Sequence, residues 1–157
     1  MSEKKPSFVH VSYIASTADK VFAALTDGRF TQEYWGGRIV ESDWKKGSPV
    51  RFSTRSGGDG GVKGTVVECD PPSLLVYTWQ QSLPGAPPLP ATKVTFSIKQ
   101  VTPNNVRLQI VHEPHEAGSE IHDMVREGWS AILSSLKSYL ETGKPLEATQ
   151  RWEQDGR

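Results

Sequence analysis

Residues 120–140 read E-I-H-D-M-V-R-E-G-W-S-A-I-L-S-S-L-K-S-Y-L, and the architecture follows from this stretch more than from any other. Its apolar residues recur every three or four positions, which predicts one face of a helix of about five turns. They are Ile121, Met124, Val125, Trp129, Ile132, Leu133, Leu136 and Leu140. Gly143 and Pro145 follow as helix-ending signals. An amphipathic helix of this length needs a large apolar surface to cover its stripe.

Seven shorter segments have the composition and alternation of β-strands. They are residues 8–15, 38–44, 49–54, 62–69, 74–81, 92–101 and 106–113. In the last hairpin, Leu108, Ile110 and His112 share one face. Short turn-forming sequences between neighbouring strands predict antiparallel pairing. In 74–81 the apolar residues fall on both faces, so the pattern leaves open whether Tyr77 and Trp79 or their neighbours point inward.

Two short helices are expected after the first strand, over residues 17–27 and 29–35. Ser16 and Asp19 have the spacing of a capping box, and Gly28 is expected to end the first helix. The order of strand, two helices, six strands and long helix predicts an α+β fold. Since an antiparallel sheet of about seven strands twists and does not stay flat, we expect it to curl around the long helix.

The chain has 157 residues, which fits one domain. We place this domain at residues 8–145, between a flexible tail of residues 1–7 and a polar tail of residues 146–157. Lys plus Arg equals Asp plus Glu, at 18 each, so no basic field is available to collect nucleic acid. The one cysteine, Cys69, excludes a disulfide within the chain and fits a reducing compartment.

The N-terminal sequence MSEKKPSF has no apolar run behind its charges, and no stretch approaches the ~18 apolar residues of a membrane span. We therefore expect no signal peptide, no membrane insertion and a cytoplasmic location.

Residues 112–116 read H-E-P-H-E, and His122 and Asp123 follow shortly after. Zinc proteases place two histidines four positions apart on a helix. Here the spacing is three, and the proline between them ends the strand and argues against a helix. The alternation places only His112 in the core-facing row. We expect no metal and no cofactor, with a site formed by three converging ligands as the alternative.

Three motifs carry a family resemblance: V-F-A-A-L-T-D-G-R-F (21–30) with Tyr34-Trp35 behind it, G-T-V-V-E-C-D-P-P-S-L-L-V-Y-T-W (64–79), and G-W-S-A-I-L-S-S-L-K-S-Y-L (128–140). Together they resemble the START/Bet v1-like (SRPBCC) superfamily, in the group related to the C-terminal domain of the Hsp90 ATPase activator. The resemblance implies a helix-grip fold, a curved sheet wrapped on a long C-terminal helix with a cavity between them. The fold serves binders, cyclases and co-chaperones, so it does not fix a function.

By position, the residues expected to line this cavity and contact a ligand are Trp35, Phe52, Tyr77, Trp79, Phe96, Leu108, Ile110, His112, Met124, Val125, Trp129 and Leu133. The preferred hypothesis is non-enzymatic binding of a small hydrophobic or amphipathic molecule. One alternative is a protein-interaction module with a chaperone or other protein partner, which the resemblance implies. The other is a cyclase- or hydrolase-like enzyme using His112, for which the sequence identifies no orienting partner.

Overall fold

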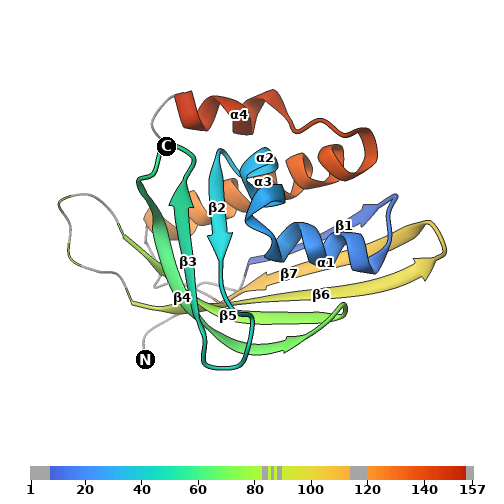
Figure 1. Cartoon of the computed structure of the whole chain (residues 1–157), viewed down its shortest axis with the longest axis horizontal. Helices are drawn as coiled ribbons and strands as arrows, with labels where there is room; N and C mark the ends of the chain where they lie inside the picture. The colour runs from blue at the N-terminus through green and yellow to red at the C-terminus, as the bar shows by residue number, and fades with distance from the viewer. Residues whose placement is uncertain (1–7, 83–84, 86, 88–89, 114–119, 155–157) are drawn as a thin grey trace.

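The structure is a computed structural model that describes residues 8–82, 85, 87, 90–113 and 120–154, without the side chains of residues 120–125, 153 and 154. Within that part of the chain a curled antiparallel sheet packs against a long helix (Figure 1). The elements are β1 (Phe8–Ile14), α1 (Ala18–Thr26), α2 (Gly28–Tyr34), β2 (Arg38–Glu41), β3 (Pro49–Thr54), β4 (Asp59–Asp70), β5 (Leu74–Gln81), β6 (Thr92–Thr102), β7 (Asn105–His112), α3 (Glu120–Thr142) and α4 (Glu147–Gln154). The α+β helix-grip fold and the order of its elements are confirmed.

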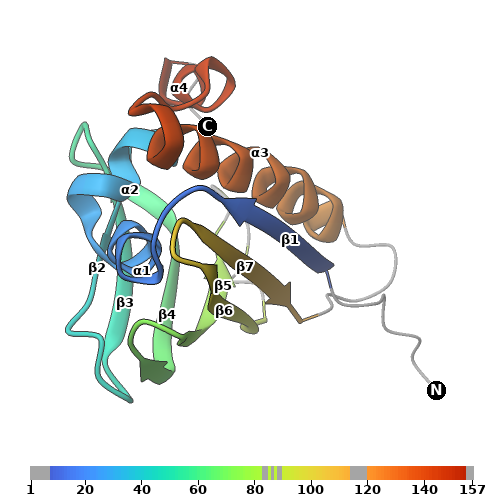
Figure 2. The ribbon, with the colours of Figure 1, turned by 90° about the vertical axis from the view of Figure 1, so that its right-hand side faces the viewer.

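The sheet has seven strands in the order β1-β7-β6-β5-β4-β3-β2. Each strand from β2 to β7 pairs with its neighbour in the chain, and β1 returns to pair with β7, with Phe8 opposite His112. Register shifts in the β3–β4, β4–β5 and β6–β7 pairs bend the strands, which suits a sheet that curls. Figure 2 shows α3 lying along the curled sheet, while α2 packs beside β2 and α1 contacts β6.

Side chains from the helices cover the backbone at both edges of the sheet. At edge strand β2, the buried Thr31 hydroxyl of α2 donates to the Arg38 carbonyl oxygen at 2.9 Å and accepts from the Val40 amide at 3.1 Å. At β1, Lys137 of α3 donates to the Tyr13 carbonyl oxygen at 2.7 Å. Edge strands with unpaired backbone groups invite association with other chains, and these contacts reduce that exposure.

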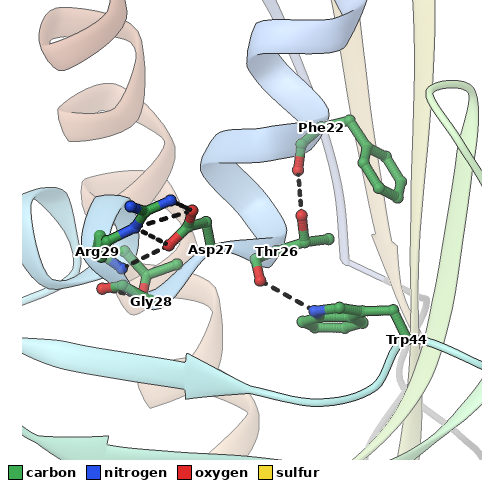
Figure 3. Close-up of polar contacts among 7 residues, drawn as sticks. Phe22, Thr26, Asp27, Gly28, Arg29 and Trp44 are labelled. Carbon is green, nitrogen blue, oxygen red and sulfur yellow. Dashed lines mark hydrogen bonds and ion pairs between the residues drawn. The ribbon is translucent and has the colours of Figure 1, made fainter.

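The first two helices begin and end differently from the sequence prediction. Thr17 caps α1, with its hydroxyl accepting from the Lys20 amide at 3.3 Å, so the prediction of a cap at Ser16 is wrong. Gly28 does not end α1 but starts α2, where Asp27 accepts from the Arg29 amide at 2.9 Å (Figure 3). A Cβ on Gly28 would lie 2.7 Å from the Val40 carbonyl oxygen, so glycine is required by the close approach of α2 to β2.

The C-terminal segment, expected as a polar tail, contains the helix α4. Its Thr149 hydroxyl lies 2.8 Å from the Ser135 hydroxyl of α3, and both residues are fully buried. The Ser135 oxygen also accepts from the Leu146 amide at 3.0 Å, so the hydroxyl pair fixes the start of α4 on α3. The tail prediction missed α4 because Ala148 and Trp152 are the apolar residues among its eight, too few to show a helical period. Residues 1–7 lie outside the described part of the chain.

Replacement by alanine should change the stability of the protein in opposite directions at two of its glycines. A Cβ on Gly64 of β4 would overlap the Thr78 carbonyl oxygen of β5, so Gly64→Ala should destabilise the protein by about 1–3 kcal/mol. A Cβ on Gly128 of α3 would meet nothing within 4 Å, so Gly128→Ala should stabilise it by about 0.5–1 kcal/mol. Urea denaturation of both variants measures the two signs, and equal stabilities would contradict the strand packing described here.

Candidate functional site

Aromatic side chains in mutual contact occupy the space between the sheet and α3. The Trp129 ring of α3 has its centroid 5.3 Å from that of Trp35, 5.2 Å from that of Trp79 and 5.8 Å from that of Phe96. Phe52 adds a centroid 5.2 Å from that of Trp35. Most of these pairs are tilted or edge-to-face, the arrangements that the ring quadrupole favours. Trp35, Phe52, Tyr77, Trp79, Phe96, His112 and Trp129 are called the aromatic cluster below.

The phase of β5 determines which of its apolar residues join this cluster. Tyr77 and Trp79 belong to the hydrophobic core, together with Leu75. Val76 is also buried but lies outside the core cluster, on the opposite face of the strand. The choice that the sequence pattern left open is therefore settled in favour of Tyr77 and Trp79.

The structure brings most of the predicted site residues together in one buried surface. Those with 6% exposure or less are Trp35, Phe52, Tyr77, Trp79, Phe96, Leu108, Ile110, His112, Trp129 and Leu133. The side chains of Met124 and Val125 lie outside the described residues. That any of these residues contacts a ligand stays a prediction.

His112 is held by a chain of hydrogen bonds across the aromatic cluster. The Trp129 indole N–H donates to His112 Nδ1 at 2.9 Å, and His112 Nε2 lies 2.7 Å from the Thr92 hydroxyl. Because an indole N–H only donates, Nδ1 must accept and Nε2 carries the proton. Nε2–H then donates to Thr92, whose hydroxyl donates to the Trp79 carbonyl oxygen at 3.2 Å. The imidazole is neutral and fixed in one tautomer.

This arrangement gives His112 a structural role. Both ring nitrogens are bonded to neutral protein groups, so neither is open to take a proton from a substrate. Sequence reasoning missed Thr92 as the partner because the residue opposite His112 in the register is Val94, and Thr92 lies diagonally from it. Thr92 and His112 lie diagonally across the β6–β7 pair on the same face of the sheet, and this relation was the sequence signal that could have identified Thr92.

The Tyr77 hydroxyl is a further polar group of the aromatic cluster. Burial raises the pKa of Tyr77 well above its usual range, so the phenol stays neutral. Burial also raises the pKa of Tyr34, and nearby Tyr77 and Tyr139 raise it further. The Tyr34 hydroxyl donates to the Ala24 carbonyl oxygen at 2.7 Å, whereas in the described part of the chain the Tyr77 hydroxyl makes no hydrogen bond.

A shallow groove lies on the outer side of α3, away from the aromatic cluster. Its walls are formed by Arg126, Glu127, Ser130, Ala131, Ser134 and Leu146. It contains none of the predicted site residues, and it is lined by both polar and apolar groups of mostly exposed residues.

The metal alternative has no support in the residues described. Among them, no three His, Cys, Asp or Glu side chains gather closely enough to hold a metal ion. Residues 114–119 and the side chains of His122 and Asp123 lie outside the described part, so that part of the alternative is untested.

Burial and the neighbouring Asp70 raise the pKa of the Cys69 thiol, which makes it a poor nucleophile. No described helix is long and apolar enough to cross a membrane.

Comparison with known proteins gives one family match. A sequence model of the family described as "Activator of Hsp90 ATPase homolog 1-like protein" matches residues 15–141. No curated protein matches this chain in sequence.

Solved structures share the fold at low sequence identity. The Aha1 dimer from Colwellia psychrerythraea is 22% identical, with a TM-score of 0.71 over 89% of this chain and 99% of that chain. An HSP90 activator from Plasmodium falciparum is 22% identical, with a TM-score of 0.68 over 87% of this chain and 96% of its own. CalU16 from Micromonospora echinospora is 19% identical, with a TM-score of 0.69 over 98% and 88%. At these identities the similarity shows the fold alone.

Removing the Thr92 hydroxyl should show how much the hydrogen bonds of His112 stabilise the protein. Thr92→Val leaves the His112 Nε2–H without its partner, and we expect a loss of about 1–3 kcal/mol in the free energy of unfolding. Thr95→Val on the same strand is the matched control, because Thr95 points to the other face, and it should change stability by no more than about 0.5 kcal/mol. Urea denaturation compares the two, and equal effects would contradict a stabilising hydrogen bond between Thr92 and His112.

Proposed function

Since this chain belongs to the activator of Hsp90 ATPase homolog 1-like family, we propose that it binds a small hydrophobic or amphipathic molecule between the sheet and α3. Family membership confirms the resemblance to the START/Bet v1-like superfamily that the sequence motifs carry. The observation that supports binding is the aromatic cluster, an apolar surface contributed by β3, β5, β6, α3 and the residue after α2.

The rings of the aromatic cluster touch one another, so a ligand enters by replacing ring–ring contacts with ring–ligand contacts. Apolar contact is not directional, and an apolar ligand offers the displaced rings the same kind of surface. The gain is roughly 25 cal/mol per Å² of apolar surface removed from water, before the costs of association. Binding of this kind selects for apolar area and leaves chemical specificity to the few polar groups present.

We propose binding without catalysis because of the state of His112. Both of its nitrogens are hydrogen-bonded within the protein, which supports a role in holding the interior together. A general base needs a nitrogen within hydrogen-bond reach of the substrate proton.

A fluorescence titration with N-phenyl-1-naphthylamine, a neutral apolar probe, tests the binding function. The protein should bind the probe saturably with one site per chain. Trp129→Ala should weaken binding at least tenfold, because Trp129 contacts more of the cluster rings than its neighbours on α3 do.

Trp152→Ala is the matched control, since Trp152 packs on Gly36 outside the aromatic cluster, and its affinity should match the unsubstituted protein. If Trp129→Ala fails to fold, Trp79→Leu serves in its place. Absence of saturable binding by the unsubstituted protein would rule out the function, as would equal affinities for the variant and its control.

A second candidate is association with an Hsp90-type chaperone, which the family and the names of two structural neighbours favour. A surface suited to a protein partner is the outer face of β1, where Val9, Val11 and Tyr13 are 55%, 39% and 56% exposed.

Retention of the protein on an immobilised Hsp90-type chaperone, followed by an ATPase assay, tests this candidate. Val9→Glu with Val11→Glu should abolish retention, because a charged outer face of β1 opposes apolar docking. Val67→Glu is the control, since Val67 is similarly exposed but lies on β4. Retention that both variants leave intact would exclude this face.

A further inference from the structure

The hydroxyl of Tyr77 lies in the interior and has no hydrogen-bond partner among the described residues. The residue is 1% exposed, and within the described residues its oxygen neither donates nor accepts a hydrogen bond. Every fully enclosed side-chain nitrogen or oxygen in that same part of the chain does have a partner. The Tyr77 oxygen is therefore not fully enclosed, and it borders a space that a water-sized group reaches. An interior hydroxyl left unpaired costs about 1–3 kcal/mol, so its retention calls for a reason.

The surroundings of Tyr77 place this space beneath the end of α1. Its ring centroid lies 5.7 Å from that of Phe96, 6.5 Å from that of Phe52 and 6.1 Å from that of Trp44. The Trp44 ring is in turn bonded to the Thr26 carbonyl oxygen at the end of α1. Tyr77 is therefore flanked by rings, one of which connects it to the end of this helix.

Trp44 packs against Tyr77 in a strained conformation. Its φ is 57°, in the left-handed region that costs a bulky residue about 1–2 kcal/mol. The half-buried ring is held by its indole N–H, which donates to the Thr26 carbonyl oxygen at 3.0 Å at the end of α1 (Figure 3). Asp43 and Lys45 on either side are exposed. Because moving Trp44 away from Tyr77 releases backbone strain, it offsets part of the lost contacts.

The surroundings of Tyr77 disfavour a charged ligand group, because burying a charge among neutral rings is costly. The rings in contact with it, Phe52, Phe96 and Trp44, carry no charge. The end of α1 presents the carbonyl oxygens of Ala24 and Thr26, and the C-terminal end of a helix repels anions. A buried neutral phenol donates its proton well to an uncharged oxygen acceptor.

We propose that Tyr77 is the polar anchor of the bound molecule, and that this molecule is an uncharged hydrophobic compound with an oxygen acceptor, such as a ketone or ester, which reaches Tyr77 past Trp44. The inference rests on the proposed binding function and adds the class of ligand to it. His112 is not the anchor, because its nitrogens are already bonded to Trp129 and Thr92.

Two probes of nearly equal shape test the anchor. Acetophenone carries a carbonyl oxygen where 2-phenylpropene carries a methylene group. An NMR titration that follows the Trp44 indole N–H should show tighter binding of acetophenone. Tyr77→Phe should weaken acetophenone binding roughly two- to tenfold and leave 2-phenylpropene unchanged, because it removes one hydrogen bond and little else. Tyr77→Phe removes an unpaired hydroxyl, so it should fold at least as stably as the parent.

Tyr13→Phe is the matched control, since Tyr13 lies exposed on the outer face of β1, and it should bind both probes as the parent does. Failure of the parent to bind either probe, together with failure to bind N-phenyl-1-naphthylamine, would refute the binding function. Binding of N-phenyl-1-naphthylamine with no preference between the two probes, or with equal effects of Tyr77→Phe on both, would refute the anchor alone.

Trp44→Gly tests the route. Glycine adopts the left-handed conformation without strain, and the variant lacks the covering ring. Exchange of acetophenone, followed by line broadening of its own resonances, should be several-fold faster than with the parent. Unchanged exchange rates would overturn the route past Trp44.

Discussion

The hydrogen bond from the Trp129 indole to His112 is the contact on which the arrangement of helix and sheet depends. Apolar contacts between α3 and the sheet stabilise the interface but favour no single position along it, because they are not directional. The bond at 2.9 Å has direction, and breaking it would leave buried polar groups unpaired. Through Thr92 and the Trp79 carbonyl it continues from β7 to β6 and β5. One polar chain therefore fixes α3 against three strands within an otherwise apolar interior.

The same principle recurs where α2 meets the sheet and where α4 meets α3. Thr31 bonds the backbone of β2 from α2, and Ser135 and Thr149 bond α4 to α3. In each case a small hydroxyl is fully buried and has its partners, which is the condition under which a buried polar group adds specificity without a large free-energy cost. Gly28 complements Thr31, since only a residue without a Cβ lets α2 approach β2 this closely. Hydroxyls and one glycine thus set positions that apolar packing leaves undetermined.

The periodicity of apolar residues predicted the features that depend on burial, such as the fold and the face on which a residue lies. It failed for helix caps and single side-chain contacts, which depend on local geometry. The stripe of α3 and the alternation of β7 gave the fold and the inward direction of His112, because a residue on the wrong face would lose its apolar surroundings. The choice between Ser16 and Thr17 as cap depends on one backbone turn, and both residues have suitable side chains. In β5, Leu75, Val76 and Tyr77 are all buried, so alternation carried no information there. The Thr92 contact needed the register of two strands, which no single segment contains.

Two polar side chains of the aromatic cluster, His112 and Tyr77, differ in their hydrogen bonding. His112 is satisfied by its neighbours and is therefore part of the framework, whereas the Tyr77 hydroxyl is left without a partner in the described residues. An apolar surface discriminates weakly between ligands, since one methylene more or less changes affinity by only about 1–3 kcal/mol. A buried group that needs a hydrogen bond discriminates by rejecting molecules that cannot supply it, because they leave it unpaired. If the Tyr77 hydroxyl were hydrogen-bonded within the protein, as His112 is, the interior could discriminate between ligands only by their size and shape. Its unpaired hydroxyl is what would turn an apolar interior into a selective one.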